Sequence, residues 1–298
     1  MKHSLQIIAC SLLFATSTIA QINPDQVEIK TTQLTDNFYM LEGRGGNILI
    51  AVASDEVMMI DSQFAPLSDK LKTAIAAITD KPLTYLVNTH HHGDHTGGNE
   101  NFNNENLNIV AQANVLKRLQ EANKPDGYLP EITLVEEMRI DLPDENAMII
   151  HVHNAHTDGD SFVYFPKSNV VHMGDVFFNG RYPYIDLKSG GSVNGYIEAQ
   201  QRVLATINPD TQIVPGHGNL GTYKDLVAHV NMLMDIRSQV KLAIAQEKSR
   251  ERILADEKIT KRYDAQGYGN GFINPERLRG TFYDSLISLE EVDQESKN

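Results

Sequence analysis

The sequence predicts an α/β fold. Short apolar runs rich in β-branched and aromatic residues alternate along the chain with segments of helical periodicity. The strand-like runs gather in two stretches, 27–111 and 147–214, so we expect two β-rich halves. The chain has 298 residues, 41% of them hydrophobic, and no linker rich in Pro, Gly or Ser divides it. We therefore expect one domain over 21–298 that buries a single large core, with a helical C-terminal region over 222–298.

The first twenty residues have the features of a secretory signal peptide. A basic start at Lys2 is followed by a short apolar stretch and by small residues at Thr18 and Ala20. This pattern predicts cleavage after Ala20 and a periplasmic or secreted protein. The segment that ends at Cys10 resembles a lipoprotein box, so lipidation there is the alternative. If cleavage follows Ala20, the chain loses its only cysteine, and any metal ligands must be His, Asp or Glu.

The next part of the chain predicts an antiparallel meander followed by a helix. Its strand-like runs, separated by turns, are 27–30, 38–41, 47–52 and 57–61. The segment from Pro66 predicts an amphipathic helix with Ser68 as its N-cap. Its apolar face comprises Leu71, Ala74, Ile75 and Ile78. The apolar run 83–89 then predicts a buried parallel strand.

Strand and helix continue to alternate after this run. We expect a helix around 115–122 and strands at 108–111, 147–152, 161–165, 169–173 and 212–214. A long helix is expected over 222–246, where apolar residues recur near helical spacing. A charged helix, a Gly/Tyr-rich turn at 263–272 and a last helix from Pro275 follow it. We expect these C-terminal helices to be packing elements.

The charge balance excludes one class of partner. The formal net charge is −13 and the acidic residues are scattered, so nucleic acid is not expected and solubility explains the charge. No apolar run after the N-terminal segment approaches the length of a membrane span. The expected partner is a small-molecule substrate, and the sequence does not predict an oligomeric state.

A dense cluster of histidines follows the expected strand at 83–89. Four of the eleven histidines occupy positions 90–95, together with Asp94. Neutral imidazoles and ionised carboxylates are ligands of divalent cations, and burying so many of them without a partner would be costly. Open α/β sheets hold ligands outside the carboxyl ends of their strands. The sequence therefore predicts a metal site at this position.

Three further motifs also follow expected strands. They place His156 in the segment 154–160, Asp175 at the end of 172–175, and His217 within 214–218. Taken in this order with the histidine cluster, they resemble the metallo-β-lactamase superfamily, whose HxHxDH signature matches the segment 90–95. The resemblance extends from about 38 to 218 and implies the four-layer αβ/βα sandwich of that fold, with extra C-terminal helices.

The resemblance also implies two divalent metal ions. Zinc is the first expectation, and manganese or iron would suit the same nitrogen and oxygen ligands. One ion is then held by His90, His92 and His156, the other by Asp94, His95 and His217, and Asp175 bridges them.

Such a site lowers the pKa of a shared water, so that hydroxide forms near neutral pH. The resemblance implies that this hydroxide attacks an amide or ester carbonyl, while Asp94 orients it and passes its proton to the leaving group. A β-lactam is the first named substrate. A lactonase or thioesterase of the glyoxalase II or quorum-quenching type is the alternative. An iron-dependent oxidoreductase on the same scaffold is the alternative from another class.

Substrate binding is expected to depend on the loop after Asp175. Zinc β-lactamases with a cysteine ligand at that position carry a lysine three residues later, where this chain has Phe178. Arg181 and Lys188 are the candidates to hold a substrate carboxylate in its place. Tyr182, Tyr184 or Tyr196 is the candidate to donate a hydrogen bond to a lactone carbonyl, with Tyr182 named first.

The remaining histidines are not expected to bind metal. Because side chains alternate along an extended segment, His91 should point away from its neighbours. His229 is expected on the surface of the long helix. Asp61, at the end of its strand, is expected to support a ligand. Core or ligand-supporting positions are expected for His151, His153 and His172.

Overall fold

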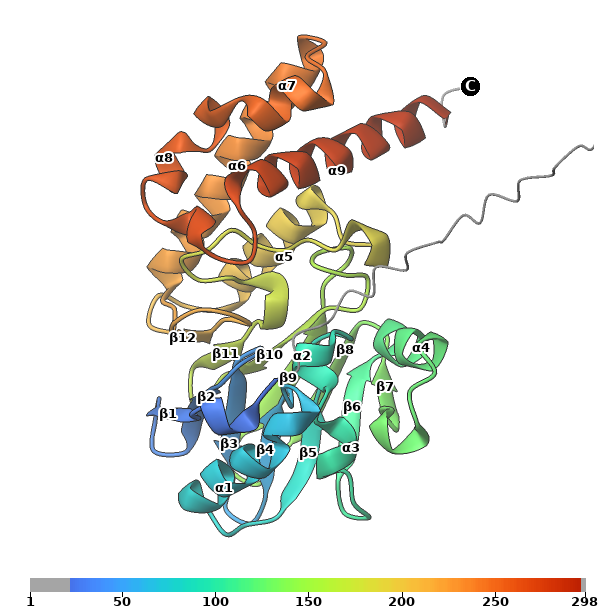
Figure 1. Cartoon of the computed structure of the whole chain (residues 1–298). Helices are drawn as coiled ribbons and strands as arrows, with labels where there is room; N and C mark the ends of the chain where they lie inside the picture. Colours follow the sequence, from blue (N-terminus) through green and yellow to red (C-terminus); the bar gives the residue numbers. More distant parts are fainter. Residues whose placement is uncertain (1–21, 296–298) are drawn as a thin grey trace, which may run out of the picture.

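The computed structural model describes residues 22–295, so the expected signal peptide at 1–20 and the lipidation alternative at Cys10 lie outside the described residues. Two β-sheets pack face to face in the lower half of Figure 1, and helices cover their outer faces. Within the described residues, no helix is both long enough and apolar enough to span a membrane.

The first sheet contains seven strands in chain order. They are β1 (Lys30–Gln33), β2 (Phe38–Glu42), β3 (Ile48–Val52), β4 (Val57–Ile60), β5 (Leu83–Val87), β6 (Asn108–Gln112) and β7 (Ile132–Leu134). Strands β1 to β4 pair antiparallel, and β4 to β7 pair parallel. The expected meander and the expected parallel strand before the histidine cluster are both confirmed.

The second sheet contains five strands. Their order is β12 (Gln212–Val214), β11 (Val170–His172), β10 (Ser161–Phe165), β9 (Asn146–His151) and β8 (Glu137–Asp141). Strands β8 to β11 pair antiparallel, whereas β11 and β12 run parallel. Consequently β11 and β12 end at the same edge of the sheet, where Asp175 and His217 follow them.

The hydrophobic clusters define four layers. Helix α1 (Ser68–Ile78) packs Leu71 and Ile75 on the outer face of the first sheet. The two sheets meet through a shared core that includes Met40, Val110 and Val163. Helix α5 (Val193–Thr206) packs on the outer face of the second sheet. The predicted four-layer sandwich is therefore confirmed.

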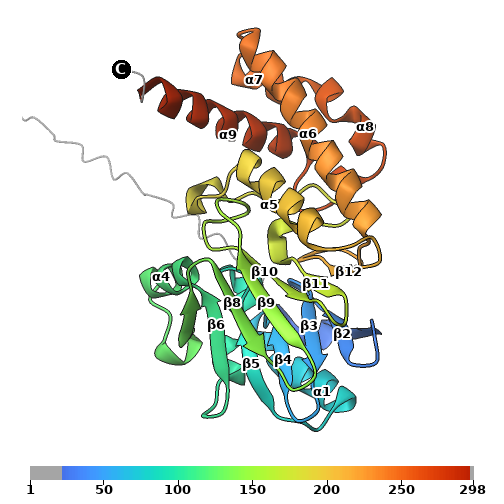
Figure 2. The same cartoon turned by 180° about the vertical axis from the view of Figure 1, so that it is seen from behind.

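Shorter helices follow the strands of the first sheet, and longer ones end the chain. The first group is α2 (Gly93–Thr96), α3 (Asn99–Phe102) and α4 (Ala113–Glu121). The second group is α6 (Tyr223–Ala245), α7 (Arg250–Ala255), α8 (Lys261–Asp264) and α9 (Pro275–Glu295). Figure 2 shows the second group stacked on α5, on the side away from the sheets. A capping box formed by Thr222 and Asp225 begins α6.

Some elements differ from the expectation. Strand β1 begins at Lys30 instead of Val27, and Ser68 is the first residue of α1 and not its cap. Strands β7 and β8 and helix α5 were not anticipated. The strands are short with few apolar residues, and α5 carries a glycine and β-branched residues that lower helix propensity. Only the Ser192 side chain, which accepts from the amide of Gly195, is a helix-start signal.

The expectation of a surface position for His229 is wrong. Its ring is buried between α5 and α6, where Nδ1 lies 3.0 Å from the Gln200 amide nitrogen and Nε2 donates to the carbonyl of Arg181 at 3.3 Å. The helical period placed this position near the edge of the apolar face, but α5 and the C-terminal turn cover it. Burial lowers the pKa of His229 to about 4.

This burial predicts a pH-dependent stability that His229→Gln removes. Below about pH 6.5 the unfolded chain protonates this histidine, whereas the folded protein keeps it neutral down to about pH 4. Folding stability therefore falls as the pH drops through this window, by about 2 kcal/mol at pH 5. Urea unfolding at pH 7.5 and pH 5, with a chelator present throughout, should show that His229→Gln lacks this part of the loss. His153→Gln, which changes an exposed histidine, should retain it, and equal behaviour of the two variants would contradict the assignment.

Candidate metal centre

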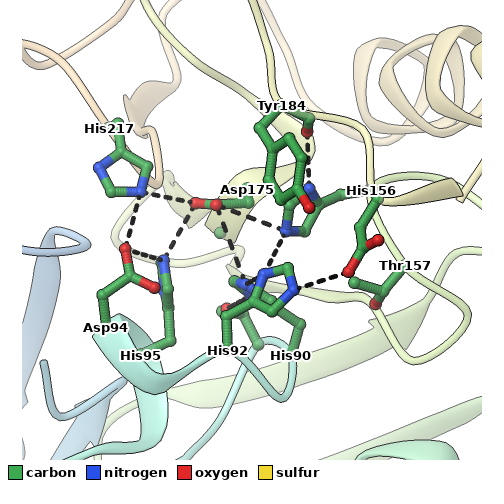
Figure 3. A network of polar contacts seen from close by, with 12 residues as sticks. His90, His92, Asp94, His95, His156, Thr157, Asp175, Tyr184 and His217 are labelled. Carbon is green, nitrogen blue, oxygen red and sulfur yellow. Dashed lines mark hydrogen bonds and ion pairs between the residues drawn. The ribbon is translucent and has the colours of Figure 1, made fainter. Parts of the chain in front are cut away.

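Four chain segments bring the predicted ligands together at one rim of the sandwich (Figure 3). The irregular segment between β5 and α2 carries His90 and His92, and α2 itself carries Asp94 and His95. The other three lie in turns that follow strands. They are His156 after β9, Asp175 after β11 and His217 after β12.

The carboxylate of Asp175 lies between two groups of side chains. Its Oδ2 is 3.5 Å from His156 Nε2 and 3.9 Å from His90 Nε2. Its Oδ1 is 3.1 Å from His95 Nε2 and 3.3 Å from His217 Nε2. One carboxylate thus faces both of the histidine groups that the sequence predicted.

Hydrogen bonds on the outer side of the histidine rings determine which ring nitrogen carries the proton and which one keeps a free lone pair toward the centre of the cluster. A carbonyl or carboxylate oxygen can only accept, so the ring nitrogen that contacts it carries the proton. His156 Nδ1 donates to the carbonyl of Tyr184 at 2.7 Å, and His92 Nε2 donates to Asp186 at 3.1 Å. His156 Nε2 and His92 Nδ1 are therefore left with free lone pairs, and both face inward.

Asp61 fixes two more rings in the same way. Its carboxylate accepts from His95 Nδ1 at 2.7 Å and from the hydroxyl of Thr89 at 2.8 Å. Because that hydroxyl donates to Asp61, it accepts from His90 Nδ1 at 3.1 Å. The Nε2 atom of His90 is then also unprotonated. Burial opposes a charge on His95, but Asp175 and Asp61 outweigh it and raise its pKa well above the ordinary value, so His95 Nε2 carries a proton toward Asp175. Asp61 holds this position in a left-handed backbone conformation, with φ of 63°, which an ordinary residue rarely adopts.

The inward nitrogens fit a metal ion. His92 Nδ1 lies 3.1 Å from His90 Nε2 and 2.9 Å from His156 Nε2, with no proton available between these lone pairs. On the other side of the carboxylate, His95 Nε2 and Asp175 Oδ1 are buried 3.1 Å apart, and within the described residues neither atom makes a well-aligned hydrogen bond. Converging lone pairs repel one another unless a cation lies among them, and imidazole with carboxylate is a ligand set for divalent ions.

The pKa shifts agree with two different electrostatic environments. Burial lowers the pKa of His156 to about 4 and that of His90 well below its ordinary value. Burial also opposes a charge on His217, but the nearby carboxylates outweigh it and raise its pKa to about 9. Burial would raise the pKa of Asp175, yet His217 and His95 hold it well below its usual range. Neutral rings are ready to ligate on one side, and positive charge is favoured on the other.

Two glycines allow the backbone to approach this cluster. A Cβ atom at Gly46 would lie 2.1 Å from the ring of His95, and one at Gly216 would lie 2.1 Å from Asp175 Oδ1. Any side chain at either position would displace a ligand. The sequence indicates turns at both positions. Gly46 belongs to the glycine-rich loop 43–46, and Gly216 follows a proline directly before His217.

A cleft of about 860 Å³ opens beside the cluster. Apart from the histidines and aspartates of the cluster, its walls consist of Arg44, Gly45, Phe64, Gly93, Phe178, Arg181, Tyr182, Tyr184, Phe272 and Ile273. Over the described part of the chain, neither Arg44 nor Arg181 forms an ion pair with a carboxylate.

The three predicted substrate-binding residues have different environments. Arg181 is exposed and lines the cleft. Lys188 is exposed in the turn after Asp186 and does not line it. The ring of Tyr182 borders the cleft, but its hydroxyl donates to Asp264 at 2.6 Å. The hydroxyl of Tyr182 is thus engaged within the protein, contrary to the expectation that it donates to a substrate.

The other histidines of the region lie outside the group of side chains around Asp175. His91 packs against the ring of His92 at 4.5 Å and forms, with His92 and Asp186, a second group outside the Asp175 cluster. His151 and His172 are buried and hydrogen-bonded, as expected. The expected core position of His153 is wrong, since it is exposed and pairs with Glu136 at 3.1 Å.

Asp186 was not anticipated from the sequence, and Tyr184 was expected to donate to a substrate carbonyl, not to support a ligand. Each supports a histidine of the cluster through a hydrogen bond that joins distant parts of the chain. Only their place in the loop after Asp175, which was expected to contact substrate, pointed to this region.

Comparisons with known proteins agree with this architecture. The model of the metallo-beta-lactamase superfamily matches residues 37–217. A hydroxyacylglutathione hydrolase from Nitrosococcus oceani is 27% identical over 208 residues, which are 66% of this chain and 73% of that protein. A second one, from Rhodospirillum rubrum, is 32% identical over 97 residues, 33% of this chain and 35% of that protein. This chain thus matches only about a third of the length of the second relative.

Solved structures of metallo-beta-lactamases share the fold. The enzyme from Pontibacter korlensis superposes with a TM-score of 0.62 at 18% identity, over 70% of this chain and 100% of its own. DIM-1 metallo-beta-lactamase superposes with a TM-score of 0.61 at 19% identity, over 70% of this chain and 98% of its own. Since the family match covers more than half of the sequence and ends at the last histidine of the cluster, this chain belongs to the metallo-beta-lactamase superfamily and is an enzyme of the hydrolase type.

Proposed function

We propose that the protein uses two divalent metal ions, zinc in the first place, to hydrolyse an amide or ester bond in a small anionic substrate. The observation that carries this proposal is the convergence of histidine nitrogens and carboxylate oxygens on both sides of Asp175. The free lone pairs of His90, His92 and His156 lie on one side, and His95, His217 and Asp94 lie on the other. The N-terminal sequence supports a place outside the cytoplasm, in the periplasm or the medium.

The seven candidate ligands divide into sets for two metal ions. His90, His92 and His156 would hold one ion, Asp94, His95 and His217 the other, and Asp175 would contact both. When bound, such ions polarise a carbonyl oxygen and make a water more acidic. Manganese or iron would suit the same ligands.

Asp94 is the residue that we assign to proton transfer. Its Oδ2 lies 3.3 Å from His217 Nε2 and 3.8 Å from His95 Nε2, and its side chain lines the cleft. Burial would raise its pKa, but the two histidines outweigh this effect and lower it. The carboxylate is therefore ionised, accepts the proton of the attacking water, and returns it to the leaving group.

The cleft supports an anionic substrate. The charged side chains that line it outside the Asp175 cluster are Arg44 and Arg181, both without carboxylate partners in the described chain, in a protein of net charge −13. A β-lactam, whose carboxylate lies beside the scissile amide, is the first substrate we name. Similarity to hydroxyacylglutathione hydrolases favours an anionic thioester as the second.

Turnover of four substrate types tests this proposal. A chromogenic cephalosporin, a hydroxyacyl glutathione thioester, a panel of acyl-homoserine lactones and simple uncharged esters should be offered to the zinc-loaded protein. We expect the cephalosporin or the thioester to be cleaved fastest, with activity lost to a chelator and restored by zinc. Asp175→Ala should lower kcat/KM by at least about 100-fold, because it removes the group between the two ligand sets. Absence of turnover of every substrate by the zinc-loaded protein would refute the proposal.

Arg181 and Lys188, the two cations that the sequence predicted to hold a substrate carboxylate, should differ in their effect on substrate binding. Arg181→Ala removes a charge-assisted partner of the substrate carboxylate, so KM should rise about 10-fold or more while kcat changes little. Lys188→Ala is the matched control, because this cation belongs to the same loop but lies outside the cleft wall. Steady-state kinetics on the best substrate measures both. A larger effect of Lys188→Ala would show that the carboxylate binds elsewhere.

A further inference from the structure

One wall of the cleft comes from the C-terminal helical region. Phe272 and Ile273 line the cleft, although the superfamily match ends at residue 217. Phe272 is 73% exposed, so most of its ring surface is available to a group bound in the cleft. The expectation that this region only packs on the rest of the fold is therefore incomplete.

Phe272 is linked to the histidine cluster through a single ring. The centroid of Tyr184 lies 5.6 Å from that of His156 and 5.9 Å from that of His92. On its other side, Tyr184 meets Phe272 edge-on at 5.8 Å. A group bound against Phe272 is thus one ring away from the side chains that would hold the metal.

Arg277, in the first turn of α9, lies beside both rings. Its guanidinium carbon lies 4.6 Å from the centroid of Phe272 and 5.3 Å from that of Tyr184. This cation–π contact favours the observed position of both rings.

The same turn also lies beside the proposed carboxylate-binding residue. The methylene carbons of Arg181 approach Gly271, the neighbour of Phe272, with its Cδ 3.4 Å from the ideal Cβ position. An anionic group at Arg181 and an apolar group at Phe272 would therefore belong to the same small molecule.

We propose that Phe272 is a specificity residue that binds a flat, aromatic substituent of the substrate while Arg181 binds its carboxylate. This inference rests on the proposed function in taking the ligand of the cleft to be the substrate and Arg181 to bind its carboxylate. Phe64 and Phe178, which also line the cleft, provide further apolar surface for such a group. An aromatic ring stacked on Phe272 should strengthen binding about 10-fold over a methyl group.

Calorimetric titration of the full, zinc-loaded chain with two probes tests the proposal. N-phenylacetylglycine and N-acetylglycine share the carboxylate and the amide and differ by one phenyl ring. We expect the wild type to bind the phenyl probe about 10-fold more tightly. Phe272→Ala should remove the preference and Phe272→Trp should keep it. Leu242→Ala, which alters another exposed apolar residue of the C-terminal region, should leave it unchanged.

Equal affinity of the wild type for the two probes, no binding of either, or a preference that survives Phe272→Ala would overturn the assignment. The outcome is separable from that of the proposed function. A preference that depends on Phe272 in a protein that hydrolyses none of the four substrate types would leave the binding role and refute the hydrolysis. Hydrolysis of a substrate by a protein that shows no preference for the phenyl probe would support the proposed function and refute the role of Phe272.

Discussion

Asp175 is 5% exposed, and burial of an ionised carboxylate costs several kcal/mol unless positive charge or hydrogen-bond donors compensate. Here the compensation comes from imidazoles on separate segments, so the sheets and turns must meet at this point. The imidazoles are themselves oriented by Asp61, by Asp186 and by the carbonyl of Tyr184. Gly216 lets the chain pass against the carboxylate. The arrangement of the whole rim follows from satisfying this one buried group.

Two regions of the chain contribute to the cleft. The matched superfamily region supplies all the side chains that we propose as metal ligands, whereas the C-terminal helical region supplies part of the cleft wall. Tyr184 touches both, because its carbonyl holds His156 and its ring meets Phe272. If Phe272 binds substrate as we propose, a change in the C-terminal turn alters the choice of substrate without disturbing the ligands.

Local patterns predicted most of the fold and placed the cluster. The strand before 90–95 and the later motifs each follow an apolar run, and parallel strands bring their carboxyl ends to one edge. The remainder depends on contacts between distant segments. His229 is buried because α5 covers it, and the hydroxyl of Tyr182 is occupied by Asp264, 82 residues away. Phe272 faces the cleft only because the C-terminal helices return over it, which no local periodicity encodes.

The number and position of bound metal ions test the central claim most directly. Crystals of the protein loaded with zinc should give two anomalous scattering peaks, one on each side of the Asp175 carboxylate. The first should lie among His90, His92 and His156, and the second beside His95 and His217. A single peak, or peaks that do not contact Asp175, would contradict a two-metal centre built around this carboxylate.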